Sequence, residues 1–226
     1  MGAKLKEGMV MKILVINPNT SVEMTKTIDS EAKKCAPPGT EITTVNPPDG
    51  PSFMSNAYHS AIQTPKVLDI LERNKGSYDY FILACGLDPG LDACRVVVKN
   101  IIGMAEASIM TACALAKQFS FLSSTEETAA AVPDRLRSLG IDPSRCASAR
   151  PVGTSDEIVK KRKEMLDHYC QIGQKCIEDG AGALILSCAG MSDIKQHLEQ
   201  RLKVPVIAGV ISAIKIAEQF SGIPRA

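Results

Sequence analysis

Short apolar segments alternate with amphipathic segments along the whole chain. Segments with the apolar or β-rich character of strands lie at 12–16, 41–45, 79–84, 100–104, 119–123, 147–152, 183–187 and 205–208. Between them, apolar residues recur every three or four positions, as in helices with one buried face. These helical segments lie at about 21–35, 56–73, from 89 onward, and at 106–117, 125–139, 155–179, 192–202 and 210–220. Strands alternating with helices predict an α/β fold built on parallel sheets.

Polar residues and a proline mark where several of these helices begin. Thr20 with Glu23 fits a capping box, which predicts that Thr20 is the N-cap of the first helix. Asp88 before Pro89 fits an N-cap followed by proline at the first helical position, although Asp88 could equally assist catalysis. Ser155 is expected to cap the long helix that follows it.

One strand sequence nearly recurs in the second half of the chain. Residues 82–86 read Ile-Leu-Ala-Cys-Gly, and residues 185–189 read Ile-Leu-Ser-Cys-Ala. Cys188 lies 103 residues after Cys85, a little under half the length of the chain. The repeat therefore predicts two similar α/β halves, each with a strand that ends at a thiol.

Composition restricts the class of protein. The chain has 226 residues, of which 45% are hydrophobic and 23% charged, and its net charge is +1. This charge balance and the absence of tryptophan give no indication of a nucleic-acid or anionic-membrane partner. No apolar run reaches the roughly 18 residues that a membrane span needs, and residues 1–11 lack the apolar stretch of a secretory signal. We therefore expect a cytoplasmic protein whose first eleven residues form a loose extension.

The eight cysteines are expected to be reduced in the cytoplasm. No Cys-x-x-Cys motif occurs and the three histidines are isolated from one another, so we expect no metal site. Neither Gly-x-Gly-x-x-Gly nor Gly-x-x-x-x-Gly-Lys-Ser occurs, so we expect no nucleotide cofactor. Most of the cysteines should be inert packing residues. Those within helical patterns are Cys94, Cys113, Cys170 and Cys176.

Cys85 and Cys188 differ from these because each follows a strand. Ligands of parallel α/β sheets bind beyond the carboxyl ends of the strands. Small residues follow each thiol, Gly86 in one half and Ala189 with Gly190 in the other, so a ligand can approach the backbone. A helix begins soon after each cysteine. Its free N–H groups favour an anion and are expected to lower the thiol pKa toward neutrality.

Two thiols on opposite faces of one carbon can racemise it without a cofactor. One removes the proton next to a carbonyl, and the other delivers a proton to the opposite face. Backbone N–H groups after each cysteine can bind the enolate oxygen that forms. A single cysteine at such a position is more often a buried residue that ends a strand. The matched pair favours the catalytic interpretation.

Four segments resemble the aspartate/glutamate/hydantoin racemase superfamily, in particular its hydantoin and allantoin racemase branch with its fungal homologues. They read ILVINPNTS at 13–21, ACGLDPGLDACR at 84–95, GMAEASIM at 103–110 and LSCAGM at 186–191. They occur in the order of the family, and the resemblance extends over residues 11–220. It implies two flavodoxin-like halves with the active site in the cleft between them.

The resemblance also implies a division of the chain and a set of site residues. The first half comprises residues 1–105 with 209–226, because the last helix usually returns to it, and the second comprises 106–208. Cys85 and Cys188 act as acid and base on a small-molecule substrate, without cofactor or metal, in a fold that often forms homo-oligomers. The candidate substrate-binding residues are Asn17, Ser21, Gly86, Asp88, Ser124, Thr125, Ala189 and Gly190.

Alternatives are open for some residues and for the reaction. Asn17 could simply satisfy a turn, and Ser124 with Thr125 could simply cap a helix. The branch usually has a bulky residue and then glycine after the first cysteine, whereas this chain has Gly86-Leu87. The leading hypothesis is a racemase of a 5-substituted hydantoin or allantoin, because both cysteines are retained. The alternatives are a decarboxylase or a cis/trans isomerase of a small diacid, or a ligand-binding protein without turnover.

Overall fold

The computed structural model describes residues 10–153 and 155–221, and its elements follow the predicted alternation of strands and helices. The first part contains β1 (Met11–Ile16), α1 (Val22–Cys35), β2 (Thr40–Val45), α2 (Ala57–Asn74), β3 (Tyr80–Leu83), α3 (Leu91–Val97), β4 (Ile101–Gly103) and α4 (Met104–Leu115). The second contains β5 (Phe119–Ser123), α5 (Glu126–Ala130), α6 (Val132–Ser138), η1 (Pro143–Arg145), β6 (Cys146–Pro151), α7 (Ser155–Lys160), α8 (Leu166–Glu178), β7 (Leu184–Leu186), η2 (Ala189–Ile194), α9 (Lys195–Leu202), β8 (Val206–Ala208) and α10 (Gly209–Phe220). Residues 1–9 of the predicted N-terminal extension lie outside the described range.

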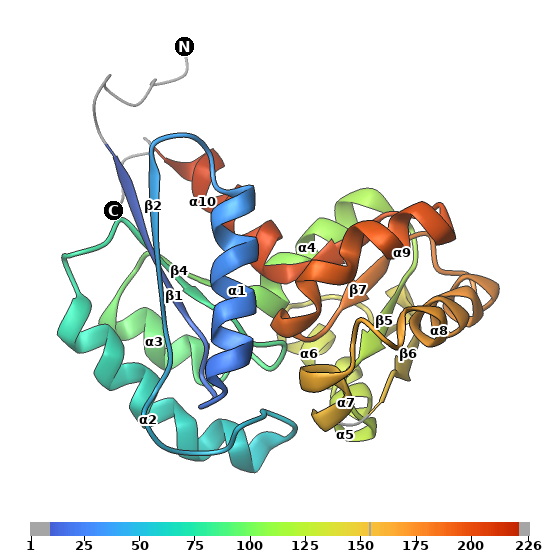
Figure 1. Cartoon of the computed structure of the whole chain (residues 1–226), viewed down its shortest axis with the longest axis horizontal. Helices are drawn as coiled ribbons and strands as arrows, with labels where there is room; N and C mark the ends of the chain where they lie inside the picture. The colour runs from blue at the N-terminus through green and yellow to red at the C-terminus, as the bar shows by residue number, and fades with distance from the viewer. Residues whose placement is uncertain (1–9, 154, 222–226) are drawn as a thin grey trace.

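The strands form two parallel sheets with the same order. One sheet runs β2-β1-β3-β4 and the other runs β6-β5-β7-β8, so β3 and β7 occupy equivalent positions. Figure 1 shows the two sheets side by side, each with helices against it. The predicted α/β fold with two similar parallel-sheet halves is therefore confirmed. Within the described residues, no helix has both the length and the apolar character needed to cross a membrane.

Helices α1, α4 and α10 lie between the sheets and give the two halves a common core (Figure 1). Helix α10 packs against α1 and α4, and it also contacts β3, β4 and β8. The largest cluster of buried side chains includes residues of both sheets, such as Ile82 and Leu184, together with Ile214 of α10. The proposed chain division at residue 209 stays a prediction, because α10 touches both sheets.

Two predicted helices are interrupted. The segment 125–139 forms α5 and α6, which meet at Ala131 two residues before Pro133. Proline cannot donate the backbone hydrogen bond that a continuous helix needs at this position. The segment 155–179 forms α7 and α8, with turns at 161–165 where the sequence reads Lys-Arg-Lys-Glu-Met. Arg162 points inward there, to Asp193 of η2. The expected capping by the Ser155 side chain lies outside the described side chains.

Two helix starts also differ from the sequence prediction. The N-cap of α1 is Ser21, whose Oγ accepts a hydrogen bond from the Met24 N–H at 3.2 Å, so the assignment of Thr20 was wrong. The segment expected to be helical from residue 192 begins instead as the 3₁₀ turn η2 at Ala189, and α9 starts at Lys195. This turn begins directly after Cys188.

Candidate active site

The two strand-end thiols open onto one cavity. Cys85 lies two residues after the end of β3, and Cys188 lies two residues after the end of the equivalent strand β7. Both line a cavity of about 430 Å³ whose wall includes residues of both halves. Among the described residues that line it, no other cysteine is present. The structure therefore brings together the two thiols that the repeat singled out.

Gly86 lies where the two cysteine loops touch. A β-carbon on this residue would be 2.0 Å from the Ser187 carbonyl oxygen, a backbone atom with little freedom to move. Only glycine therefore allows the loop after Cys85 to approach the loop of Cys188 this closely. This contact explains why glycine comes directly after Cys85 in this chain, and Leu87 takes a place in the cavity wall.

Burial dominates the proton affinity of both thiols. It raises the pKa of Cys85 to about 12, against the lowering effect of the Leu87 N–H. It raises the pKa of Cys188 to about 11, against the lowering effects of the Gly190 N–H and the Arg162 charge. The expectation of a thiol pKa near neutrality is wrong for this structure, because desolvation outweighs the N–H groups of the loop after Cys85 and of the turn after Cys188. Both thiols are protonated at pH 7.

Asp88 is buried and binds to α4 and α6, and it is not the N-cap of the helix α3 that follows it. Helix α3 begins at Leu91 with Gly90 as N-cap, so the expected capping role was wrong. The Asp88 carboxylate accepts hydrogen bonds from the N–H groups of Ala105 and Glu106, at 3.1 and 2.9 Å, which begin α4. It also accepts one from Arg135 of α6 at 2.5 Å.

The Asp88 side chain is fully buried and does not line the cavity, whereas its partner Arg135 does. Burial raises the Asp88 pKa to about 6, although Arg135 and the backbone N–H groups lower it. The carboxylate thus joins the loop of Cys85 to α4 and to α6 of the second half.

The loop after β1 contains two asparagines. Asn19 lines the cavity, and Asn17 holds Asn19 in place. Asn17 is fully buried, and its amide donates to Asn19 Oδ1 and to Thr25 Oγ1, both at 2.9 Å. Asn19 Oδ1 also accepts from the Ser21 N–H at 2.9 Å. Asn19 lines the cavity, whereas Asn17 and Ser21 do not. The sequence prediction named Asn17 of this turn motif, whereas Asn19 is the asparagine in the cavity wall; a substrate-binding role for Asn17 stays a prediction.

The remaining predicted residues divide in the same way. Ser124 and Ala189 line the cavity, whereas Thr125 is the N-cap of α5 and Gly190 lies against Met24 and the Cys188 sulfur. Ser187, which the sequence did not single out, also lines the cavity. Its Oγ accepts a hydrogen bond from the Ser124 N–H at 3.0 Å.

Much of the cavity wall is apolar, and sequence reasoning missed it. Large apolar side chains come from the loop before α2, from α4, from β5 and from α6. They are Phe53, Met54, Ile109, Phe121 and Val132. Their sequence pattern is that of ordinary core residues, so only the three-dimensional structure identifies them. Among the described residues, no group of three or more His, Cys, Asp or Glu side chains could hold a metal ion.

Comparison with known proteins gives a consistent picture. The Asp/Glu/hydantoin racemase family model matches residues 13–217. A hydantoin racemase of Pseudomonas sp. (strain NS671) is 36% identical over 213 residues, covering 92% of this chain and 85% of that protein. A hydantoin racemase of Rhizobium meliloti is 31% identical, with 94% and 89% covered. The structure of allantoin racemase from Klebsiella pneumoniae superposes with a TM-score of 0.89 at 32% identity, covering 94% of this chain and 88% of that one.

Proposed function

The chain belongs to the Asp/Glu/hydantoin racemase family, and we propose that it racemises 5-monosubstituted hydantoins by proton transfer between C5 and the thiols of Cys85 and Cys188. The observation that carries this proposal is the pair of thiols at the ends of equivalent strands, open to one cavity. The C5 proton of a hydantoin lies next to a ring carbonyl. Its removal therefore leaves a planar enolate that can be reprotonated on either face.

The reaction needs one thiolate and one thiol at the same time. For one enantiomer, the Cys188 thiolate removes the C5 proton and the Cys85 thiol donates a proton to the opposite face; for the other enantiomer the roles exchange. The N–H groups that follow each cysteine favour its thiolate. The charge of one thiolate also raises the pKa of the other, as the effect of Cys188 on Cys85 indicates. This coupling favours the state with one thiol and one thiolate over the state with two thiolates.

The cavity wall favours an apolar substituent at C5. Phe53, Phe121 and Val132 would pack against a benzyl or isobutyl group, and burial of such a group is favourable by about 25 cal/mol per Å². Allantoin instead has a polar ureido group at C5. Burial of that group against apolar side chains costs free energy unless each of its polar atoms finds a partner. We therefore place 5-benzyl- or 5-isobutylhydantoin ahead of allantoin as the substrate.

The test uses the purified protein with each pure enantiomer of 5-benzylhydantoin and of allantoin. Optical rotation follows racemisation, and proton NMR in D₂O follows uptake of deuterium at C5, with a sample without protein as the control. The proposal expects racemisation of 5-benzylhydantoin with a kcat/KM at least about tenfold above that for allantoin. A factor of ten corresponds to a difference of about 1.4 kcal/mol in transition-state stabilisation. Binding without deuterium uptake would instead support the ligand-binding alternative, and loss of CO₂ from a substituted malonate would support the decarboxylase.

A further inference from the structure

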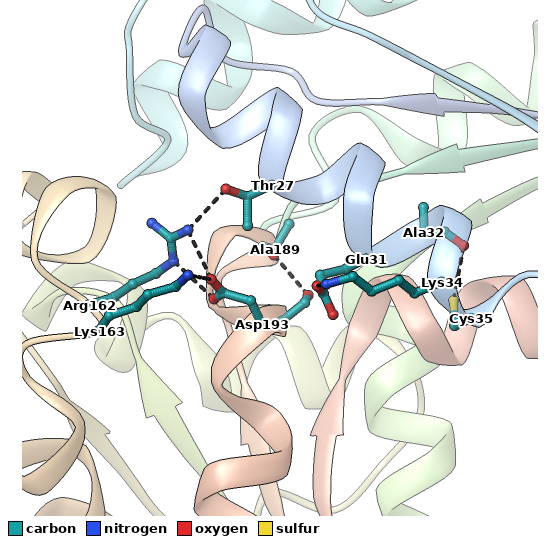
Figure 2. Close-up of polar contacts among 10 residues, drawn as sticks. Thr27, Glu31, Ala32, Lys34, Cys35, Arg162, Lys163, Ala189 and Asp193 are labelled. Carbon is teal, nitrogen blue, oxygen red and sulfur yellow. Dashed lines mark hydrogen bonds and ion pairs between the residues drawn. The ribbon is translucent and has the colours of Figure 1, made fainter.

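Arg162 connects the turn after Cys188 to the other half of the molecule. Its guanidinium donates to both carboxylate oxygens of Asp193, at 2.9 and 3.0 Å, and also to Thr27 Oγ1 of α1 at 3.0 Å. Figure 2 shows the guanidinium between these two partners. The side chains of Arg162 and Asp193 are only 12% and 13% exposed. One nearly buried cation therefore joins the segment before α8, the turn η2 and helix α1.

The turn that Arg162 holds carries the N–H groups that act on the thiol. Asp193 belongs to η2, whose first residue directly follows Cys188. The Ser192 hydroxyl closes this turn by donating to the Ala189 carbonyl oxygen at 2.8 Å. The N–H groups of Gly190 and Met191 face Cys188 and lower its pKa. The orientation of these groups thus depends on how η2 is fixed.

The charge of Arg162 acts on the same sulfur. It lowers the pKa of Cys188, and the thiolate in turn raises the pKa of Arg162. The loop of Cys85 carries the opposite charge, since the Asp88 carboxylate raises the pKa of that thiol. Among the described side chains, the titratable groups that act on Cys188, Arg162 or their neighbours include Glu23 of α1, Cys85, Glu157, Lys163, Tyr169 and Asp193.

We propose that Arg162 is a positioning residue for Cys188. Its hydrogen bonds to Asp193 and Thr27 fix the turn after the thiol, and its positive charge near the sulfur favours the thiolate. The catalytic meaning of this inference rests on the proposed racemase function. The reactivity of the thiol does not, because it can be measured without substrate. A failed positioning role and a failed racemase assignment can therefore be told apart.

The experiment measures the alkylation rate of each cysteine by iodoacetamide against pH, in the full-length protein, with peptide mapping. Arg162→Met should move the Cys188 profile to higher pH and slow its alkylation at pH 8 by about tenfold, the change expected for one pKa unit. The profile of Cys85 should stay in place. Arg162→Lys, which keeps the charge but loses the two-pronged contact, should restore part of the rate.

A matched control is Arg150→Met. Arg150 forms the same two-pronged contact with Asp179, at 2.8 and 2.9 Å, in the same half but outside the cavity wall. This variant should leave the Cys188 profile unchanged. Thr27→Val, which removes the link to α1 and keeps both charges, should slow Cys188 less than Arg162→Met does, and it decides the question if Arg162→Met does not fold.

An unchanged Cys188 profile in the folded Arg162 and Thr27 variants would overturn the inference, as would equal shifts at Cys85 and Cys188. A shift confined to Cys188 supports it. If that shift occurs in a protein that exchanges no C5 proton, the positioning role stands and the racemase assignment fails.

Discussion

The loops of Cys85 and Cys188 are equivalent in the fold but differ in charge. Each follows the third strand of a sheet with the same order, and each places backbone N–H groups near its sulfur. The first loop also contains Asp88, which raises the pKa of its thiol, whereas the second is next to Arg162, which lowers it. The repeated fold therefore fixes where the thiols are, and the non-repeated charges set how readily each one ionises.

This asymmetry does not favour one direction of the overall reaction. Two enantiomers have equal free energy, so the kcat/KM values of the two directions must be equal in any racemase. Different thiol pKa values can change the individual steps but not this ratio. The difference between the two loops therefore becomes visible only when one thiol is removed or when each is probed alone.

The largest expected effect comes from removal of either thiol. Cys85→Ser and Cys188→Ser should each reduce racemisation by about 10²–10⁴-fold, because a hydroxyl is a far weaker acid than a thiol and a general acid or base is worth that factor. Optical rotation of 5-benzylhydantoin measures the loss. Cys113→Ser, on α4 and outside the cavity wall, should retain the wild-type rate. Near-normal racemisation by either loop variant would exclude that cysteine as acid or base.

Asp88 should give the next largest effect, on stability. Burial raises its pKa from 3.8 to about 6, so the folded state holds this proton more tightly than the unfolded state does. The resulting stabilisation is present below about pH 4 and is lost as the pH rises through 6, by about 2–3 kcal/mol. Urea unfolding of the wild type and of Asp88→Asn at pH 4 and pH 8 tests this. From pH 4 to pH 8, the free energy of unfolding of the wild type should fall by about 2–3 kcal/mol relative to that of the variant.

Asp179 is a control for Asp88, because the pH dependence of its contribution to stability has the opposite sign. Its hydrogen bond from Arg150 is the main cause that lowers its pKa to about 2. The stabilisation from this carboxylate is therefore present above about pH 4 and is lost as the pH falls through 2. Wild type and Asp179→Asn should show no loss of relative stability between pH 4 and pH 8. A loss for Asp179 equal to that for Asp88 would refute the assignment to burial.

The glycines of the two loops should differ in tolerance. A β-carbon at Gly86 would meet the Ser187 carbonyl oxygen at 2.0 Å, whereas one at Gly190 would meet the flexible Met24 side chain at 3.1 Å. Gly86→Ala should therefore destabilise the protein by about 1–3 kcal/mol, the usual cost of overpacking, and should also reduce racemisation. Gly190→Ala should cost less. Equal unfolding midpoints for the two variants would contradict the close contact of the loops.

The smallest expected effect is the order in which the two thiols react. The Arg162 charge lowers the pKa of Cys188, whereas the Asp88 carboxylate raises the pKa of Cys85, so Cys188 has the larger thiolate fraction at any pH well below both values. Cys188 should therefore be alkylated faster than Cys85 at pH 8, and both rates should rise with pH. Faster labelling of Cys85 in peptide mapping would contradict the effects of Asp88 and Arg162 on the two thiol pKa values.

The sequence could predict the features that depend on local patterns. Hydrophobic periodicity identified the strands and most helices, and the repeat around Cys85 and Cys188 identified two equivalent halves. The strand and helix periods are properties of consecutive residues, and the repeat is visible when two five-residue segments are compared. The two-sheet fold and the family are confirmed, and both thiols line one cavity.

The sequence could not predict features that depend on distant partners. Asp88 before Pro89 has the local pattern of an N-cap, but its carboxylate binds Ala105 and Arg135, far away in the chain. Phe53 has the pattern of a core residue, yet it lines the cavity. The thiol pKa values were predicted from helix-start N–H groups, whereas burial decides them, and burial depends on the whole fold.

The central claim is that the two thiols act on opposite faces of one carbon. Proton NMR in D₂O tests it most directly, with Cys85→Ser and Cys188→Ser each given the two pure enantiomers of 5-benzylhydantoin. Each variant retains one base, so each should exchange the C5 proton of one enantiomer with retention of configuration, and the two variants should act on opposite enantiomers. If both variants exchange the same enantiomer equally, the two thiols do not serve opposite faces and the account is wrong.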